Sequence, residues 1–183
     1  MRILLLLIVI IFSSCEDDVV VKPSAMLRLE YSEAKYVPLE SDCFFKFMRN
    51  ENAIIQKKQN CRMNLYYPKM KATLYLTYMK IKGEHQIDSL LYDAQKLTYD
   101  HTIKAESIIE QPRIDTLNKV YGMFYMINGN AATQSQFYVT DSVNHFVTGA
   151  LYFDVKPNFD SLYPAIIYLR NDIRKIMETI KWK

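Results

Sequence analysis

The spacing of apolar residues changes along this chain, and that change decides which elements the chain can form. Between residues 71 and 81, apolar side chains alternate with polar ones, which predicts a strand with one buried face. Between residues 86 and 109 the inner positions recur about every 3.6 residues, which predicts a long amphipathic helix with room for one break, closed by Pro112. The positions on its inner stripe are Ile87, Leu90, Leu91, Ala94, Leu97, His101, Ala105, Ile108 and Ile109.

The rest of the chain holds further strand patterns and one more helix. Runs at residues 43–48, 53–56 and 63–67 precede the strand at 71–81. Residues 120–127 and 135–140 flank Asn128, Gly129 and Asn130, a signal typical of a hairpin turn, and residues 145–155 predict a last strand. Residues 162–180 predict a C-terminal helix with Pro164 in its first turn, where proline is tolerated.

This order of elements predicts one α+β domain. Strands that are joined by short connections pair antiparallel, and amphipathic helices cover the faces of such a sheet. We therefore expect a single domain over residues 36–183, with a mostly antiparallel sheet flanked by two amphipathic helices. The sequence shows no internal repeats.

The N-terminal segment predicts a lipoprotein signal. Residues 3–12 form an unbroken apolar run that is too short to span a hydrocarbon core of about 30 Å as a helix but suits a secretory signal peptide. Ser13 and Ser14 then precede Cys15, as in a relaxed lipobox. We expect a signal peptide at 1–14, a Cys15 that carries diacylglycerol and a further acyl chain such as palmitate, and a polar tether over 15–35. The alternative is an ordinary signal peptide with an incidental cysteine.

Two cysteines remain in the predicted domain, Cys43 and Cys61. Outside the cytoplasm two thiols in one small domain commonly pair, and closing this loop would stabilise the fold by about 3 kcal/mol. The alternative is two buried free thiols. Neither cysteine lies in a C-x-x-C pattern, which argues against redox catalysis.

The sequence contains no recognisable catalytic, metal or nucleotide motif. No two of its three histidines have a metal-ligand spacing, and no phosphate-binding glycine loop occurs. Asp100 and His101 could act as acid and base, but no nucleophile motif accompanies them, and His101 fits the edge of a core. With 23 Lys and Arg against 20 Asp and Glu, the charge of +3 does not indicate a nucleic-acid binder.

Tyrosine is abundant, with 14 residues in the chain. Tyrosine packs well at half-buried sheet positions and is also enriched at protein interfaces. Both interpretations remain open for the tyrosines that fall in predicted strands. They are Tyr75, Tyr78, Tyr121, Tyr125, Tyr138 and Tyr152.

From about Tyr36 to its end, the chain resembles the gliding motility lipoprotein GldD family of Bacteroidota. The stretches that carry the resemblance are SDC (41–43), CRMNL (61–65), PKMKA (68–72), LTYDHTIKA (97–105), VYG (120–122), INGNAA (127–132), QFYVTDS (136–142), HF (145–146), GALYF (149–153), PNFDSL (157–162) and ETIKW (178–182). Two departures are a reduced tether pattern at residues 22–26 and Arg62 in place of an aromatic residue.

The resemblance implies an accessory lipoprotein of the gliding motility machinery and the linked type IX secretion system, which supports other lipoproteins of that machine. It implies no catalytic residue. The order of strands and helices is also similar to that of the Mog1/PsbP fold, and we expect no cofactor, no metal, no nucleic-acid partner and no small-molecule substrate. We expect a lipid anchor in the cell envelope, with the outer membrane favoured and the domain facing the periplasm or the cell surface. The acids at residues 16–18 resemble a surface-export signal, or form a solvated tether.

Three hypotheses therefore stand at this point. The first is a non-catalytic assembly or stability factor that contacts other lipoproteins. The second is an envelope hydrolase that uses Asp100 and His101, which requires a nucleophile beside them. The third is a lipoprotein that binds a small ligand or a glycan, which requires a concave pocket lined by aromatic side chains.

Overall fold

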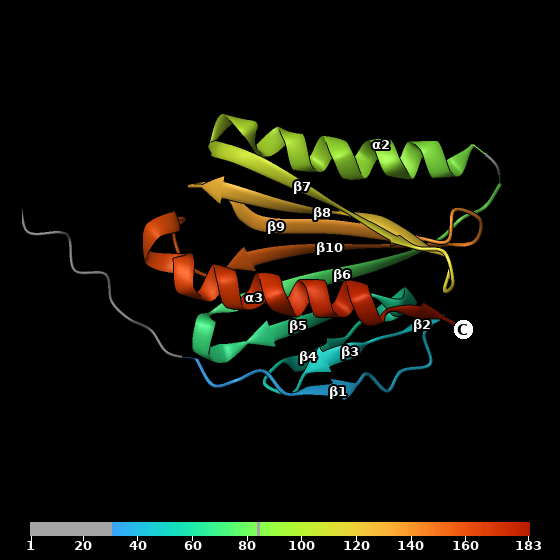
Figure 1. Ribbon diagram of the computed structural model, residues 1–183, viewed down its shortest axis with the longest axis horizontal. Coiled ribbons are helices and arrows are strands. Elements are labelled where there is room, and N and C mark those ends of the chain that lie inside the picture. The colour runs from blue at the N-terminus through green and yellow to red at the C-terminus, as the bar shows by residue number, and fades with distance from the viewer. Residues whose placement is uncertain (1–30, 84) are drawn as a thin grey trace, which may run out of the picture.

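A seven-stranded antiparallel sheet forms the centre of the structure, a computed structural model in which residues 31–83 and 85–183 are described (Figure 1). The strand order is β4-β5-β6-β10-β9-β8-β7, and every neighbouring pair runs antiparallel. The strands are β4 (Ile54–Lys57), β5 (Met63–Tyr67), β6 (Ala72–Lys80), β7 (Ala105–Asp115), β8 (Val120–Gly129), β9 (Thr133–Thr140) and β10 (His145–Phe153).

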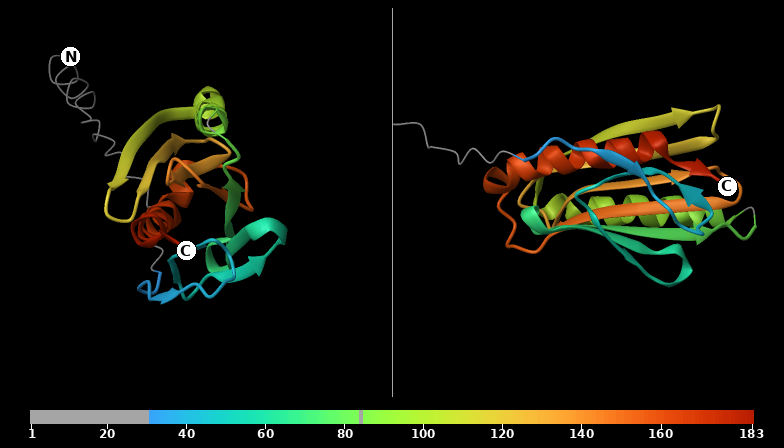
Figure 2. Two further views of the ribbon diagram at one scale, coloured as in Figure 1. Left: turned by 90° about the vertical axis from the view of Figure 1, so that its right-hand side faces the viewer. Right: turned by 90° about the horizontal axis from the view of Figure 1, so that it is seen from below.

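Two helices cover opposite faces of this sheet. They are α2 (Gln86–Tyr99), which continues into the short turn η3 (Asp100–Ile103), and α3 (Phe159–Thr179). Thr98 of α2 donates a hydrogen bond of 2.7 Å to the side chain of Gln136 in β9, whereas the neighbouring Ser135 accepts one of 3.4 Å from Arg170 of α3. Because successive strand residues point to opposite faces, the sheet lies between the helices, as Figure 2 shows.

The larger hydrophobic core lies on the α3 face. Most of its buried side chains come from five strands of the main sheet and from α3, and each large one stabilises the fold by about 1.5–3 kcal/mol. Among them are Leu65, Leu74, Phe124, Phe137, Val139, Val147, Leu151, Leu169, Ile173 and Ile176. The core under α2 is smaller and is centred on Ile81, Leu90 and Phe146.

Two short ribbons extend the α3 side of the molecule. β1 (Tyr36–Pro38) pairs with β3 (Met48–Asn50), and β2 (Phe45–Lys46) pairs with β11 (Lys181–Trp182). The 3-10 turns η1 (Gln59–Cys61) and η2 (Pro68–Met70) flank β5. The single strand predicted at residues 43–48 was therefore wrong, because its two halves pair with different partners outside the main sheet.

Most of the predicted elements are confirmed. β5 ends directly before Pro68, β6 covers the alternating segment, and β8 and β9 form the predicted hairpin. The C-terminal helix begins at Phe159, where the side chain of Asn158 accepts a hydrogen bond from the backbone of Ser161. The predicted α+β class and the mostly antiparallel sheet with two flanking helices are confirmed as well.

The predicted helix over residues 86–109 is wrong in its second half. The helix and its 3-10 extension end at Ile103, and residues 105–115 form β7 instead. β7 pairs only with β8, so it is an edge strand and tolerates Pro112, which cannot donate a hydrogen bond. Ile109 has the spacing expected of the buried face of a helix, yet its side chain is exposed. The apolar spacing at this point therefore did not reflect burial.

The described chain begins and ends at opposite ends of the sheet. Tyr31 packs against Tyr168 of α3 with ring centroids 5.5 Å apart, at the end that also holds η2, and the C terminus lies at the other end (Figure 1). We call the end that holds the C terminus the distal end. None of the helices in the described ranges is long and apolar enough to cross a membrane.

Candidate functional site

An aromatic cluster lies at the distal end, where β6, β10 and the β2–β11 ribbon meet. Trp182 stacks on the ring of His145 with centroids 5.2 Å apart and an interplanar angle of 16°. The ring centroid of His145 also lies 6.2 Å from that of Phe44, and the centroids of Phe44 and Tyr78 are 5.3 Å apart. The Tyr78 hydroxyl is 2.9 Å from Nδ1 of His145, so the imidazole is held by stacking and by a hydrogen bond.

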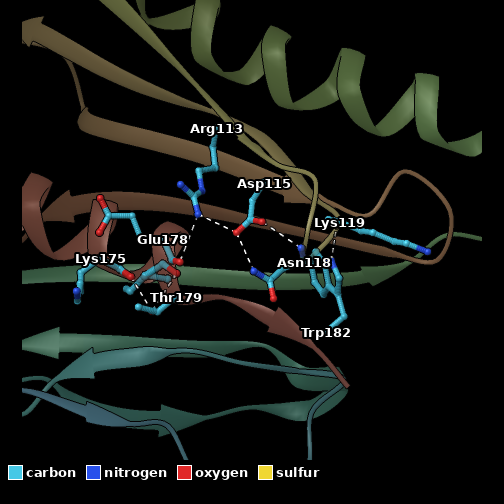
Figure 3. Close-up of polar contacts among 9 residues, drawn as sticks. Arg113, Asp115, Asn118, Lys119, Lys175, Glu178, Thr179 and Trp182 are labelled. Carbon is cyan, nitrogen blue, oxygen red and sulfur yellow. Dashed lines mark hydrogen bonds and ion pairs between the residues drawn. The ribbon is translucent and has the colours of Figure 1, made fainter.

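The backbone fixes Trp182 within this cluster. Its indole N–H donates to the carbonyl oxygen of Lys119 at 3.0 Å, and the next residue, Lys183, donates its backbone N–H to the carbonyl of Phe44 at 2.9 Å. Figure 3 shows Trp182 reaching the turn between β7 and β8. The last residues of the chain thus join two turns that are distant in sequence.

The β7–β8 turn is itself held by a carboxylate. Asp115 accepts hydrogen bonds from the side chain of Asn118 at 2.9 Å and from its backbone N–H at 3.0 Å, and it pairs with Arg113 at 3.0 Å (Figure 3). The bonds from Asn118, with a smaller contribution from Arg113, lower the pKa of Asp115 below its ordinary value. Lys119 then adopts a left-handed backbone with φ of 51°, which ends the turn.

A second carboxylate sets the position of His145. Asp141 Oδ1 accepts backbone N–H bonds from Val143 at 3.0 Å, Asn144 at 2.8 Å and His145 at 2.8 Å. Although burial acts to raise the pKa of Asp141, these three bonds outweigh it and the pKa lies below its ordinary value. The β9–β10 turn therefore holds His145 from the backbone side.

The structure joins Cys43 and Cys61 by a disulfide beside this cluster. Their Cα atoms are 5.5 Å apart, and both cysteines pack against the larger core. The bond ties the segment before Phe44 to η1, where Asn60 and Cys61 have positive φ angles. It therefore fixes the loop that presents Phe44 to solvent.

The chemistry of the distal end favours contact with another molecule over acid–base catalysis. Phe44 is 49% exposed, and on the adjoining turns Val143 is 66% and Leu117 is 91% exposed. Exposed apolar side chains that gather at one end of a domain are typical of an interaction site. The imidazole of His145 stacks with the rings of Trp182 and Phe44 and lies within hydrogen-bond distance of the Tyr78 hydroxyl, so it is part of a packed aromatic platform.

Asp100 and His101 lie elsewhere, in η3 at the end of α2. Nε2 of His101 is 3.3 Å from Nε2 of Gln136, and its side chain is half-buried, as the core-edge interpretation expected. Burial lowers the pKa of His101, and Asp100 opposes that shift only in part. The described contacts bring no hydroxyl nucleophile to this pair, so the structure does not assemble the arrangement that a hydrolase would need. The expectation that the protein is not an enzyme stays a prediction.

A small cavity lined by tyrosine lies near the first described residues. Its volume is about 220 Å³, and Tyr31, Tyr67 and Tyr168 contribute to its wall. Asp172, one turn along α3 from Tyr168, accepts hydrogen bonds from Tyr36 and Asn50, both at 2.7 Å, but does not line the cavity. Ligand pockets usually measure about 300–1,000 Å³, so this cavity suits only a small group.

The other predicted site residues have mixed outcomes. Cys15 and the tether residues 16–30 lie outside the described residues. Among residues 31–83 and 85–183, no group of three or more His, Cys, Asp or Glu could hold a metal ion, and the expected lack of a metal or cofactor stays a prediction. The tyrosines in strands divide between buried ones, such as Tyr125, and the exposed Tyr75, so each of the two interpretations fits some of them.

Reasoning from the sequence missed the distal cluster. Phe44, Tyr78, His145 and Trp182 span most of the domain, and no short motif joins them. One signal was available, because Cys43, Cys61, Asp141, His145 and Trp182 all belong to stretches that carry the family resemblance. The fold brings those stretches together at one end.

Comparison with models of known protein families identifies a family for this chain. A family model described as gliding motility lipoprotein GldD matches residues 16–182. A search among curated proteins finds no match to this chain. The family match begins directly after Cys15 and extends through Trp182, so it includes the whole distal cluster.

Proposed function

Because this chain belongs to the gliding motility lipoprotein GldD family, we propose that it is a non-catalytic accessory factor that supports other lipoproteins of the gliding machinery and of the linked type IX secretion system. The observation that carries this proposal is the match over residues 16–182, which covers nearly all of the predicted tether and of the predicted domain. The distal aromatic cluster supports it, since a packed platform with exposed apolar side chains suits protein contact better than catalysis.

The two ends of the domain are arranged as expected for a module that is tethered at one end and contacts a partner at the other. The described chain begins at one end of the sheet, and the C terminus, next to Trp182 of the aromatic cluster, lies at the other end (Figure 1). An anchor at Cys15 would attach the domain from the first end, and the distal end would then be free for partners. We propose on this basis that lipidated Cys15 holds the protein at the envelope, with the outer membrane favoured.

The second candidate function is binding of a small ligand or a glycan. The tyrosine-lined cavity favours it, because aromatic rings beside the polar side chains of Ser32, Asn52 and Lys69 can hold a small polar molecule. Tyr168→Ala would open this cavity and weaken such binding, whereas variants at the distal end would leave it unchanged. The two candidates therefore differ in which end of the domain matters.

The proposed function is tested by deletion and complementation in the source bacterium. We would measure the steady-state levels of the other gliding lipoproteins, secretion of type IX cargo, and colony spreading. Wild type and His101→Ala are expected to restore all three, and Cys15→Ala is expected to fail because the protein loses its anchor. Normal levels of partner lipoproteins in the deletion strain, together with a stable His101→Ala protein that fails to complement, would refute the proposal and turn attention to Asp100 and His101.

A further inference from the structure

Positive charge gathers in two adjoining hollows at the distal end. The first, of about 740 Å³, is lined by Lys57, Lys58 and Arg62, and the second, of about 490 Å³, by Lys80 and Lys82. Asn60 lines both hollows, so they form one continuous surface, which we call the cationic hollow. No carboxylate side chain among the described residues lines it.

The five cations of the cationic hollow account for more than the whole net positive charge of the chain. The sequence has 23 Lys and Arg against 20 Asp and Glu, and removing these five cations leaves 18 against 20, a charge of −2. All five side chains are exposed, and no ion pair found among residues 31–83 and 85–183 engages any of them. Like charges that line one surface repel one another, so an anionic partner that covers several of them would relieve that repulsion.

The backbone beneath these cations is held in place. The backbone N–H of Lys58 donates to the carbonyl of Arg62 at 2.8 Å, which closes the β4–β5 turn, and the disulfide at Cys61 ties that turn to the segment before Phe44. Lys80 and Lys82 flank Ile81, whose side chain is buried. The hollow is therefore largely formed before a partner arrives, which reduces the entropy cost of binding.

An aromatic wall completes the hollow. Phe44 and Tyr78 line its second part and stack on each other, and half of the Phe44 side chain is open to solvent. Phe44 has no polar group with which to bind a sugar hydroxyl. The indole N–H of Trp182, which could have done so, is already bonded to Lys119. The surface therefore combines cations with an apolar contact point.

We propose that the cationic hollow binds an acidic, extended segment of a partner protein, with carboxylates facing the cations and an apolar side chain against Phe44. This inference rests on the proposed function, which supplies a protein partner. A membrane surface is the less suitable occupant, because the first described residue lies at the opposite end of the domain, where a lipidated Cys15 would attach it (Figure 1). A polyanionic glycan is less suitable because the exposed ring is a phenylalanine.

A direct binding experiment tests this surface. The protein is the mature chain with Cys15→Ser, which lacks the lipid. It is titrated into a short fluorescently labelled peptide that has one phenylalanine flanked by glutamates. Binding is measured by fluorescence anisotropy at low and at high salt. We expect Lys80→Glu/Lys82→Glu to weaken binding by about tenfold or more and to reduce its salt dependence. The matched control, Lys104→Glu/Lys156→Glu, changes the charge equally at exposed positions outside the hollow and is expected to bind like wild type.

Several outcomes would overturn the inference. Equal weakening in both variants would mean non-specific attraction to net charge. If dextran sulfate binds more tightly than the peptide and Lys80→Glu/Lys82→Glu weakens that binding, the hollow is a glycan site. The same result with phosphatidylglycerol vesicles would assign it to a membrane.

Loss of peptide binding in Phe44→Ala, with the cations intact, would support the aromatic contact. Near-UV circular dichroism of each variant shows whether the fold is retained.

Complementation separates this inference from the proposed function. If the deletion lowers partner lipoprotein levels and Lys80→Glu/Lys82→Glu fails to restore them while the matched control succeeds, both proposals are supported. If the hollow variant restores them fully, the cationic hollow is not the contact site and the proposed function stands. If the deletion leaves partner levels, secretion and spreading unchanged, the proposed function itself is wrong.

Discussion

The indole of Trp182 stacks on the imidazole of His145, and this contact joins the second-to-last residue of the chain to the first residue of β10. The short β11 strand places Trp182 there by pairing with β2, and the β9–β10 turn places His145. The contact fastens the C-terminal ribbon to the central sheet, so the arrangement of the distal end depends on it.

Trp182→Ala is expected to lower the free energy of unfolding by about 2 kcal/mol, because a partly buried ring and its hydrogen bond to Lys119 are lost. Trp182→Phe keeps a ring on His145 and loses only the indole N–H, so a smaller loss of about 1 kcal/mol is expected. Urea unfolding measures both. Equal losses in the two variants would show that stacking on His145 contributes nothing.

Removal of the disulfide is expected to cost about 3 kcal/mol, because the unfolded chain regains the freedom of a loop that separates Cys43 from Cys61 by 18 positions. Cys43→Ser, Cys61→Ser and the double variant should show the same loss in urea. Reduced wild-type protein should match them. A single variant that is much less stable than the double variant would indicate damage from an unpaired thiol rather than loss of the cross-link.

The sequence predicted those elements whose apolar spacing reflects burial. β5, β6 and α3 alternate or recur in step with one buried face, and their predicted ranges are nearly those observed. β7 was mistaken for helix because an edge strand exposes most of its side chains, so Ile108 and Ile109 carry no information about a core. The two ribbons were missed because a strand of two or three residues is too short for its side chains to show a repeating pattern.

The candidate site was less accessible to sequence reasoning than the fold. Long-range register decides that Tyr78 lies across from the segment around His145, and no local pattern encodes that register. The cationic hollow likewise joins Lys57 to Lys80 only after β4, β5 and β6 have paired. Cys43 and Cys61 were the exception, because two thiols in one small domain have few possible partners.

Asp141→Asn is expected to destabilise the protein by about 1 kcal/mol at neutral pH, because a neutral amide oxygen accepts the three backbone N–H bonds less strongly than a carboxylate. The folded-state pKa of Asp141 lies below its ordinary value of 3.8. Its contribution is therefore present above pH 3.8 and is lost as the pH falls through the folded-state pKa. Urea unfolding across acid pH should show the two proteins converging at the acid end, and a constant difference would contradict this assignment.

Gly149→Ala is expected to destabilise the sheet by about 1–3 kcal/mol, since a Cβ at this position would lie 2.1 Å from Cε1 of Phe137 on the neighbouring strand. Phe137→Leu removes Cε1 and Cζ, the two atoms that would lie nearest to the added Cβ. In the double variant, the cost of Gly149→Ala should therefore shrink clearly below its cost in wild type. Thermal or urea unfolding of wild type, the two single variants and the double variant measures this double-mutant cycle. If the two losses of stability simply add, the Phe137 ring is not what disfavours a side chain at position 149.

The carboxylate of Asp172 should give stability the opposite dependence on pH. It is 1% exposed, and burial raises its pKa above the ordinary value of 3.8, against the hydrogen bonds from Tyr36 and Asn50 that act to lower it. The folded protein thus holds this proton more tightly than the unfolded chain. The resulting stability is present below pH 3.8 and is lost as the pH rises through the folded-state pKa.

Asp172→Asn isolates this effect, because the amide has nearly the same shape and does not titrate. The free energy of unfolding of wild type, minus that of Asp172→Asn, should fall as the pH rises from below 3.8 and then level off. The titration of Asp141 is common to both proteins and cancels in the difference. A difference that rises with pH would mean that the bonds from Tyr36 and Asn50 outweigh burial, and that the ionised carboxylate is the form the fold selects.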